Sequence, residues 1–242
     1  MNNLDGYVVV ITGASGGIGS AIALGLASIG AKLCLIGRNL GRLEGVARSA
    51  RKKSSQVLVC QADLSSDEEI LKVSTDLHRE FGQIDVLVHS AGAHFIGSLQ
   101  SSPALELDAL YRANVRSPYV LTQLLIPMLK ARQGQIVFVN SSQGLQAGVN
   151  VGQFACTQHA LKAYADSLRE EINPDGVRVL SLYPGRTATP RMAEVYKKEG
   201  REYRPELLLQ PGDIAQVVMN ALMMPRTAEL TNITIRPLIK SY

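Results

Sequence analysis

Three glycines in the pattern T-G-x-x-x-G-x-G, over residues 12–19, are the first residues whose spacing could support a chemistry. Glycine has no Cβ, so the peptide N–H groups around Gly13, Gly17 and Gly19 can approach a bound group closely. Where such a turn opens a helix, free N–H groups and the helix dipole favour a phosphate. The spacing matches neither G-x-G-x-x-G nor a P-loop, and alone it also fits an ordinary strand-to-helix turn. The order of strand, turn, helix and second strand favours a dinucleotide site.

The end of the second predicted strand indicates which dinucleotide would bind. NAD sites place an acidic residue about twenty positions beyond the glycines, whereas NADP sites place a cation there for the 2′-phosphate. This chain has Gly37 followed by Arg38, with no Asp or Glu at the strand end. The sequence therefore favours NADP(H) over NAD(H), although Arg38 also fits a solvated loop arginine.

Alternating strands and helices would position these residues. We predict strands over residues 7–12, 32–36, 56–61, 84–89, 135–140, 177–183 and 230–235. We predict helices over about 17–29, 40–52, 66–82, 104–131, 152–173 and 212–223. This alternation predicts an α/β fold, a doubly wound parallel sheet of seven strands with helices on both faces. The second half of the helix over 104–131 is apolar nearly all round, which predicts a partner subunit against it.

Composition argues against several other classes of protein. With 242 residues, 46% of them hydrophobic, the chain can build the core of one domain over 1–242. A net charge of +4, spread along the chain, gives no support for a nucleic-acid or membrane partner. Cys34, Cys60 and Cys156 are widely separated, which predicts reduced core residues and no metal site. A leader pattern and a long apolar run are lacking, so we expect a cytoplasmic protein.

Six motifs in order resemble the short-chain dehydrogenases/reductases, and the resemblance covers nearly the whole chain. They are Thr12-Gly13-(x)3-Gly17-x-Gly19, Asp63-Leu64, His89-Ser90-Ala91-Gly92, Asn114, Asn140-Ser141-Ser142 and Pro184-Gly185-(x)3-Thr189. The family implies a single Rossmann-like domain that oxidises or reduces a small molecule with a nicotinamide cofactor. It also implies a homodimer or homotetramer joined through residues 104–131 and 152–173, and a substrate lid at about 188–210.

The resemblance can be carried over residue by residue. The residues implied to contact the cofactor are Thr12, Gly13, Ser15, Gly17, Ile18, Gly19, Arg38, Asp63, Leu64, Ala91, Gly92, Gln158, Pro184, Gly185, Thr187 and Thr189. Asp63 would lie by the adenine, and Ala91-Gly92 would line the cofactor. The pyrophosphate would be held by Thr12, Gly13, Gly17 and Gly19, and the nicotinamide would be faced by Pro184, Gly185, Thr187 and Thr189. His89 stands where the family more often has Asn, and we interpret it as a tolerated loop variant.

The reaction centre departs from the family, which uses Asn, Ser and a Tyr-x-x-x-Lys pair. Asn114 is present, but alignment of the helix after the fifth strand places Phe154 at the Tyr position and Gln158 at the Lys position. Residues four apart share one helical face, so the geometry would survive while the chemistry changes. No tyrosine is followed by Lys after four or seven residues. Phe cannot carry a proton, and a positioned acid is typically worth about 10²–10⁴ in rate, whereas Gln can still bind ribose hydroxyls.

Two residues are candidates for the catalytic serine, and others for a proton donor in place of the family's tyrosine. Ser142 lies twelve residues before Phe154, where the family interval is thirteen, so either Ser141 or Ser142 could be the catalytic serine. The neighbouring residues favour Ser142. His94 follows the Ala91-Gly92 loop and is the better candidate for supplying a proton, although it also fits a pocket wall; His159 would be turned off the reacting face.

Three functions fit this pattern. We predict an atypical NADP(H)-dependent oxidoreductase whose proton comes from water, the substrate, Ser142 or His94. The alternatives are an NADP(H)-binding or partner-binding pseudoenzyme, and a non-redox cyclase, lyase or isomerase on the same scaffold. A further possibility is that Phe154 or Gln158 was introduced to trap a complex, but two replacements and a one-residue shortening favour natural divergence.

Overall fold

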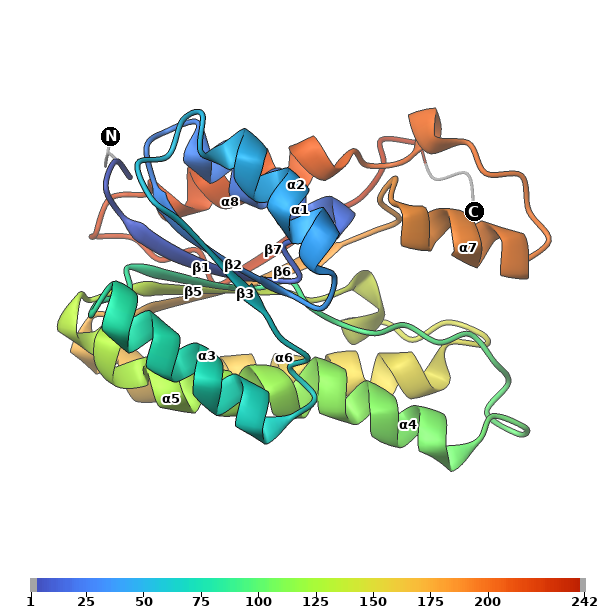
Figure 1. Ribbon diagram of the computed structural model, residues 1–242. Coiled ribbons are helices and arrows are strands. Elements are labelled where there is room, and N and C mark those ends of the chain that lie inside the picture. Colours follow the sequence, from blue (N-terminus) through green and yellow to red (C-terminus); the bar gives the residue numbers. More distant parts are fainter. Residues whose placement is uncertain (1–3, 240–242) are drawn as a thin grey trace.

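The computed structural model describes residues 4–239, in which a parallel sheet lies between two layers of helices (Figure 1). The strands are β1 (Val8–Thr12), β2 (Lys32–Gly37), β3 (Val57–Gln61), β4 (Val86–His89), β5 (Gln135–Val139), β6 (Arg178–Pro184) and β7 (Asn232–Ile235). They pair in the order β3-β2-β1-β4-β5-β6-β7, and every pair is parallel. The predicted doubly wound sheet is confirmed, with every strand end within two residues of its predicted position.

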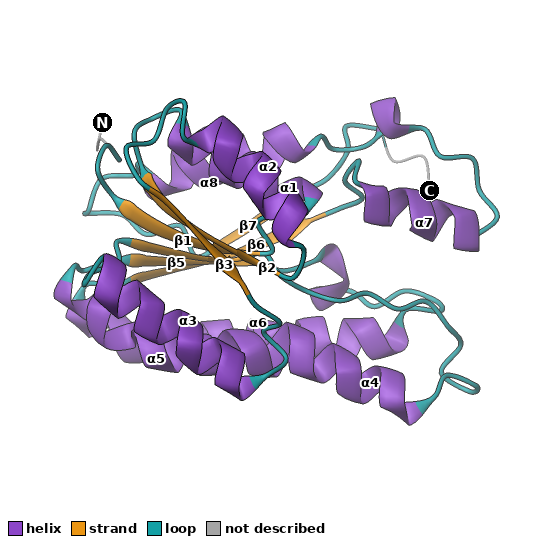
Figure 2. Ribbon diagram, viewed as in Figure 1, coloured by secondary structure: helices purple, strands orange, loops and turns teal. Residues whose placement is uncertain are grey.

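Each face of the sheet builds its own apolar core. Successive side chains of a strand point to opposite faces, so Val9 and Ile11 of β1 pack on one side and Val10 on the other. The first side is covered by α1 (Gly17–Ala27), α2 (Leu40–Ala50) and α8 (Pro211–Leu222), and the second by α3 (Asp67–Glu80), α5 (Ser117–Ala131) and α6 (Gly152–Ile172) (Figure 2). Within residues 4–239, none of the helices is both long and apolar enough to cross a bilayer.

The helix predicted over 104–131 is interrupted, which corrects the prediction of one continuous helix. It consists of α4 (Ala104–Tyr111), a π-helical turn over Arg112–Arg116, and α5. Pro118 has no N–H, so it cannot donate to the carbonyl of Asn114 in the α-helical pattern. The N–H of Ser117 instead reaches the carbonyl of Arg112, five residues earlier. The sequence already carried this signal in Pro118.

The carboxyl ends of the strands meet at one edge of the sheet. The order of the strands reverses between β1, which is followed outward by β2 and β3, and β4, which is followed by β5 and β6. Open parallel sheets bind ligands at such a switch point. Beyond this edge lie the glycine-rich turn, the loop after β4 and a further helix, α7 (Pro190–Lys198), inside the segment predicted to form a lid (Figure 1).

Candidate functional site

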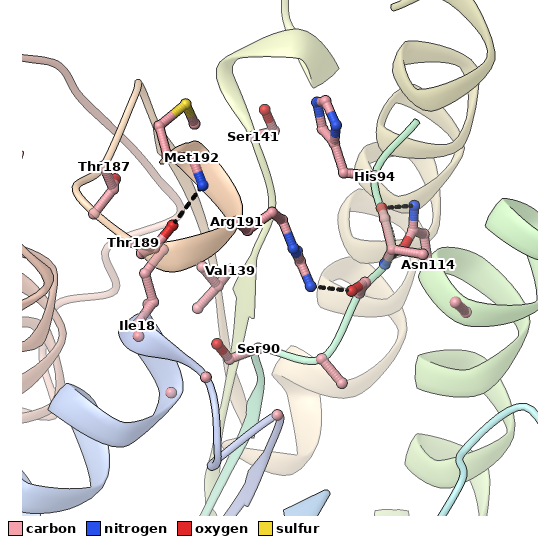
Figure 3. Close-up of a pocket in the computed structure, with 18 of the residues that line it drawn as sticks. Ile18, Ser90, His94, Asn114, Val139, Ser141, Thr187, Thr189, Arg191 and Met192 are labelled. Carbon is pink, nitrogen blue, oxygen red and sulfur yellow. Dashed lines mark hydrogen bonds between the residues drawn. The ribbon is translucent and has the colours of Figure 1, made fainter. Parts of the chain in front are cut away.

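A cleft of about 1020 Å³ opens at the switch point. Its walls are the glycine-rich turn, the loop after β4, the π-helical turn, the loop after β5, the start of α6 and residues 184–199 (Figure 3). Every residue that the sequence analysis proposed for catalysis or cofactor binding lines this cleft except Thr12. The structure therefore brings together residues that lie as far apart in the chain as Gly13 and Thr189.

Thr12 has a structural role, which corrects its assignment as a cofactor contact. Its side chain is buried, and its Oγ1 accepts hydrogen bonds from the N–H groups of Ser90 and Ala91 at 3.1 and 3.0 Å. These bonds fasten the end of β1 to the loop after β4. Thr12 thus holds two walls of the cleft together without facing it.

The glycine-rich turn has the shape of a phosphate cradle. Gly13 has φ +66°, and a Cβ there would lie 2.7 Å from the backbone N of Ala91. A Cβ on Gly17 would lie 2.6 Å from Cγ2 of Thr189. No side chain caps the start of α1, so the N–H groups of its first turn are open to a ligand. Tight backbone approach and an uncapped helix start fit the phosphates of a dinucleotide.

Arg38 and Asp63 line the end of the cleft beside β2 and β3. The Asp63 carboxylate accepts hydrogen bonds from N and Oγ of Ser65 at 3.0 and 2.8 Å. The first of these bonds does most to lower the pKa of Asp63, and the charge of Arg38 lowers it further. The Arg38 guanidinium is exposed and makes no hydrogen bond or ion pair with residues 4–239, so it is available to an anion.

The opposite end of the cleft contains Phe154 and Gln158, which the sequence predicts at the family's Tyr and Lys positions. Phe154 is buried, and its ring packs against that of His94 with centroids 4.5 Å apart. Burial, followed by the charge of Arg191, lowers the pKa of His94 to about 4, so its imidazole is neutral at pH 7. Gln158 is also buried at the cleft wall, and within the described part of the chain its carboxamide makes no hydrogen bond. That carboxamide can therefore bind a hydroxyl group of a ligand.

Asn114 connects the π-helical turn to both walls of the reaction end. Its Oδ1 accepts a hydrogen bond from the N–H of Ala93 at 2.7 Å, and its Nδ2 donates to the carbonyl of Ala93 at 3.0 Å. Nδ2 also donates to Oγ1 of Thr157 on α6 at 2.9 Å. Asn114 is therefore a fully bonded residue that positions the loop after β4 against α6.

Both candidate serines reach the cleft at the start of the loop after β5. Ser141 Oγ accepts a hydrogen bond from the N–H of Gln143 at 3.2 Å, and Ser142 begins the short 3₁₀ turn over Ser142–Gly144. Figure 3 shows Ser141 and His94 at the same end of the pocket, away from Ile18. His159 is exposed on α6 and does not line the cleft.

The comparisons with known proteins agree with this geometry. A family model described as short chain dehydrogenase matches residues 7–200. The chain belongs to the short-chain dehydrogenases. An uncharacterized oxidoreductase of Staphylococcus saprophyticus is 30% identical to it over 239 residues, which cover 98% of this chain and 100% of the relative.

Two solved structures illustrate the match of the folds. An alcohol dehydrogenase from the archaeon Thermococcus sibiricus, complexed with 5-hydroxy-NADP, has a TM-score of 0.88 and 27% identity and covers 98% of this chain and 99% of its own. L-Sorbose reductase from Gluconobacter frateurii, complexed with NADPH and L-sorbose, has a TM-score of 0.88 and 26% identity, with 96% of each chain covered. The fold therefore matches these two structures along nearly its whole length.

His89 is a buried strand residue, so its interpretation as a tolerated loop variant is wrong. It ends β4, stacks on Phe138 with ring centroids 5.0 Å apart, and its Nε2 lies 2.8 Å from Oγ1 of Thr122. Burial lowers its pKa to about 3, which keeps the imidazole neutral. In this short-chain dehydrogenase the residue at that position is part of the core beneath the cleft.

Arginine side chains from the segment after β6 also line the cleft, and sequence analysis missed them. Arg186 makes two hydrogen bonds of 2.7 Å with the Glu199 carboxylate and lies over the ring of Tyr196, 4.7 Å from its centroid. Arg191 extends from α7 across the middle of the pocket, where it donates to the carbonyl of Gly92 at 2.6 Å (Figure 3). Neither belongs to a family motif, so only their closeness to Thr189 could have drawn attention to them.

Proposed function

We propose that the protein is an atypical NADP(H)-dependent oxidoreductase acting on a small organic substrate. The observation that carries the proposal is the contrast inside one cleft, where a complete phosphate cradle leads to a reaction end without an acidic side chain at position 154. A nicotinamide cofactor, when bound, supplies or accepts a hydride. The chain would bind and orient both reactants as one domain over residues 1–242, with residues 188–210 as the lid.

The choice of NADP(H) over NAD(H) rests on Arg38. Its guanidinium is available to an anion, and no carboxylate stands at the end of β2 to accept ribose hydroxyls. The solved relatives from Thermococcus sibiricus and Gluconobacter frateurii contain 5-hydroxy-NADP and NADPH. The remaining cofactor contacts would be the cleft residues named above, with the Gln158 carboxamide bonding ribose hydroxyls in place of lysine.

The proton would come from a group other than residue 154. The Phe154 ring has no exchangeable proton, and the neutral His94 imidazole beside it can hydrogen-bond a substrate. An iminium acceptor needs no acid, because hydride addition at carbon neutralises its positive charge. A conjugated carbonyl forms an enolate, which can take its proton at carbon from water or from a weak donor. Ser141 supports this end better than Ser142, since it lies thirteen residues before Phe154 and shares the pocket end with His94 (Figure 3).

Two other functions remain as alternatives with distinct signatures. A pseudoenzyme that senses NADP(H) or stabilises a partner would bind the nucleotide and turn nothing over. A cyclase, lyase or isomerase would form product with no change in nicotinamide absorbance. Loss of two cooperating side chains motivates both alternatives, whereas the intact cradle favours the redox function.

The test is nucleotide binding followed by isotope transfer. Calorimetry with NADPH and NADH should give tighter binding of NADPH. NADPH labelled with deuterium at C4 of the nicotinamide is then offered with iminium, enone and carbonyl compounds, and the product is analysed by mass spectrometry. Deuterium in a product supports the oxidoreductase, whereas tight binding without transfer to any of these classes contradicts it and favours the pseudoenzyme.

We also propose a cytoplasmic homo-oligomer joined through α4, α5 and α6. Leu105, Tyr111 and Tyr119 lie exposed along α4 and α5, and such side chains favour burial against a second copy. Sedimentation of the protein should give a dimer or tetramer, and Leu105→Glu should shift it to a smaller species. Leu71→Glu, at an exposed leucine of α3 outside this surface, is the matched control. A monomeric parent protein would contradict the proposal.

A further inference from the structure

Arg191 lies between two walls of the cleft that both belong to the predicted cofactor site. It is the second residue of α7, and α7 begins where Cγ2 of Thr189 rests against Gly17 at the start of α1. From there the side chain crosses the cleft, and one guanidinium nitrogen donates to the Gly92 carbonyl at 2.6 Å (Figure 3). Arg191 thus spans the passage between the phosphate cradle and the reaction end.

Arg191 has no carboxylate in direct contact among the described residues. Within residues 4–239 its guanidinium forms no ion pair, and the Gly92 carbonyl is its single hydrogen-bond acceptor. Arg186 on the same segment differs, because Glu199 holds it through two bonds. A guanidinium has five N–H donors, so most donors of Arg191 remain open to a ligand.

The surroundings of Arg191 favour a bound anion. The cleft is open, so solvent reaches the side chain, yet enough protein surrounds it that burial lowers its pKa. The positive charge of Arg38 lowers that pKa further, while Glu194 opposes the effect. Two arginines that repel each other across one cleft, facing an uncapped helix start, form a site of excess positive charge. An anionic ligand would relieve both the repulsion and the loss of hydration.

We propose that Arg191 binds the pyrophosphate of the nicotinamide dinucleotide. The proposal rests on the proposed function, since it assumes a dinucleotide in the cleft. The helix start of α1 and the guanidinium of α7 would contact the phosphates from different sides, and charge-assisted bonds from arginine to phosphate are strong and directional. Binding would therefore also hold α7 over the cleft, so the cofactor would order the lid.

The test compares the two arginines with two nucleotides. NADPH and NADH share the pyrophosphate, but only NADPH carries the 2′-phosphate. Arg191→Gln should weaken the binding of both nucleotides by about 10- to 100-fold, whereas Arg38→Gln should weaken NADPH alone. Arg191→Lys, which restores the charge, should recover part of the loss. Arg204→Gln, an exposed lid arginine paired with Glu202, is the matched control and should bind as the parent does.

A second readout separates a local effect from a failure to fold. Limited proteolysis should cut the parent within residues 190–207 more slowly when NADPH is present, and Arg191→Gln should lose that protection at saturating NADPH while keeping the parent's thermal midpoint. Equal affinity of Arg191→Gln and the parent for both nucleotides would overturn the inference, as would a loss confined to NADPH. If the parent binds neither nucleotide, the proposed function itself fails.

Discussion

The two ends of the cleft are built from different kinds of groups. At the cofactor end the ligand would meet backbone N–H groups, a close approach of Gly13 to Ala91, and the start of α1. At the reaction end the family chemistry depends on two side chains, and we infer that Phe154 and Gln158 stand in their places. Backbone geometry persists as long as the fold does, whereas a single substitution removes an acid. If the chain binds NADP(H) as proposed, nucleotide binding and proton transfer are separable properties of this scaffold.

Restoring the family's Tyr and Lys should give the reaction end its proton donor again and produce the largest change in activity. Phe154→Tyr/Gln158→Lys returns a phenol and a cation to one face of α6, so carbonyl reduction should rise by about 10²–10⁴ over the parent. NADPH oxidation with a panel of aldehydes and ketones measures it. Each single variant serves as a control and should gain much less, because the lysine acts by lowering the pKa of the phenol. An inactive double variant that still binds NADPH would mean that the reaction end is misaligned beyond these two residues.

The next largest effect should identify the serine. In the Phe154→Tyr/Gln158→Lys background, Ser141→Ala should lower turnover of the best carbonyl substrate by about 10², the loss expected for one hydrogen-bond donor at the reacting oxygen. Ser142→Ala is the matched control and should retain most of the activity. The reverse order of the two variants would assign the role to Ser142, as the neighbouring residues in the sequence suggested.

A glycine substitution should probe the cofactor end through stability. Gly13→Ala forces a Cβ into a left-handed conformation and to 2.7 Å from the backbone of Ala91, at a cost of about 3 kcal/mol. Urea unfolding measures the change. Gly6→Ala is the matched control, since Gly6 has φ +74° but nothing within 4 Å of its Cβ position, and it should lose only about 1 kcal/mol. Equal losses for the two variants would show that the close approach at Gly13 carries no cost.

Acid should affect the reaction end through His94. Its pKa is about 4 in the folded chain against an ordinary 6.5, because burial disfavours the charged ring. Between pH 4 and 6.5 the unfolded chain binds a proton at His94 that the folded chain does not bind. The stability contributed by the neutral ring is therefore complete above pH 6.5 and is lost as the pH falls toward 4. Between pH 7 and pH 5 the parent should lose at most about 2 kcal/mol of its free energy of unfolding through His94, and His94→Gln should lack this loss. Urea unfolding at pH 7 and 5 measures the difference. Arg38→Ala, at the other end of the cleft, should keep the slope of the parent.

Much of the fold could be predicted because its signals are local. The apolar run of β1 is buried on both faces, and the glycines after it need their conformations, so the strand, the turn and the helix appear in the sequence in order. The interruption before Pro118 also has a local cause, in the covalent structure of proline, although the predicted helix over 104–131 lacked it. Motif positions then placed all but one of the proposed site residues on the cleft.

What could not be predicted depends on contacts between distant segments. Thr12 looks like a ligand contact in its motif, but its hydroxyl is used by the loop after β4, which comes nearly eighty residues later. From the sequence His89 was interpreted as a loop residue, but in the structure it packs against Phe138 and contacts Thr122. Arg191 belongs to no sequence motif, and only the structure shows that its side chain crosses the cleft to donate to the carbonyl of Gly92. Such roles belong to the tertiary structure.

The π-helical turn over Arg112–Arg116 also determines how this chain can change in length during evolution. A π turn holds one residue more than an α turn, and each residue of a helix adds about 100° of rotation. Deleting any one residue here would let α4 and α5 join smoothly while turning Asn114 away from Ala93 and Thr157. The exposed Arg112 can be replaced by another residue type, but the number of residues in the π-helical turn cannot change. We therefore expect that homologues tolerate substitutions in this segment and reject insertions and deletions.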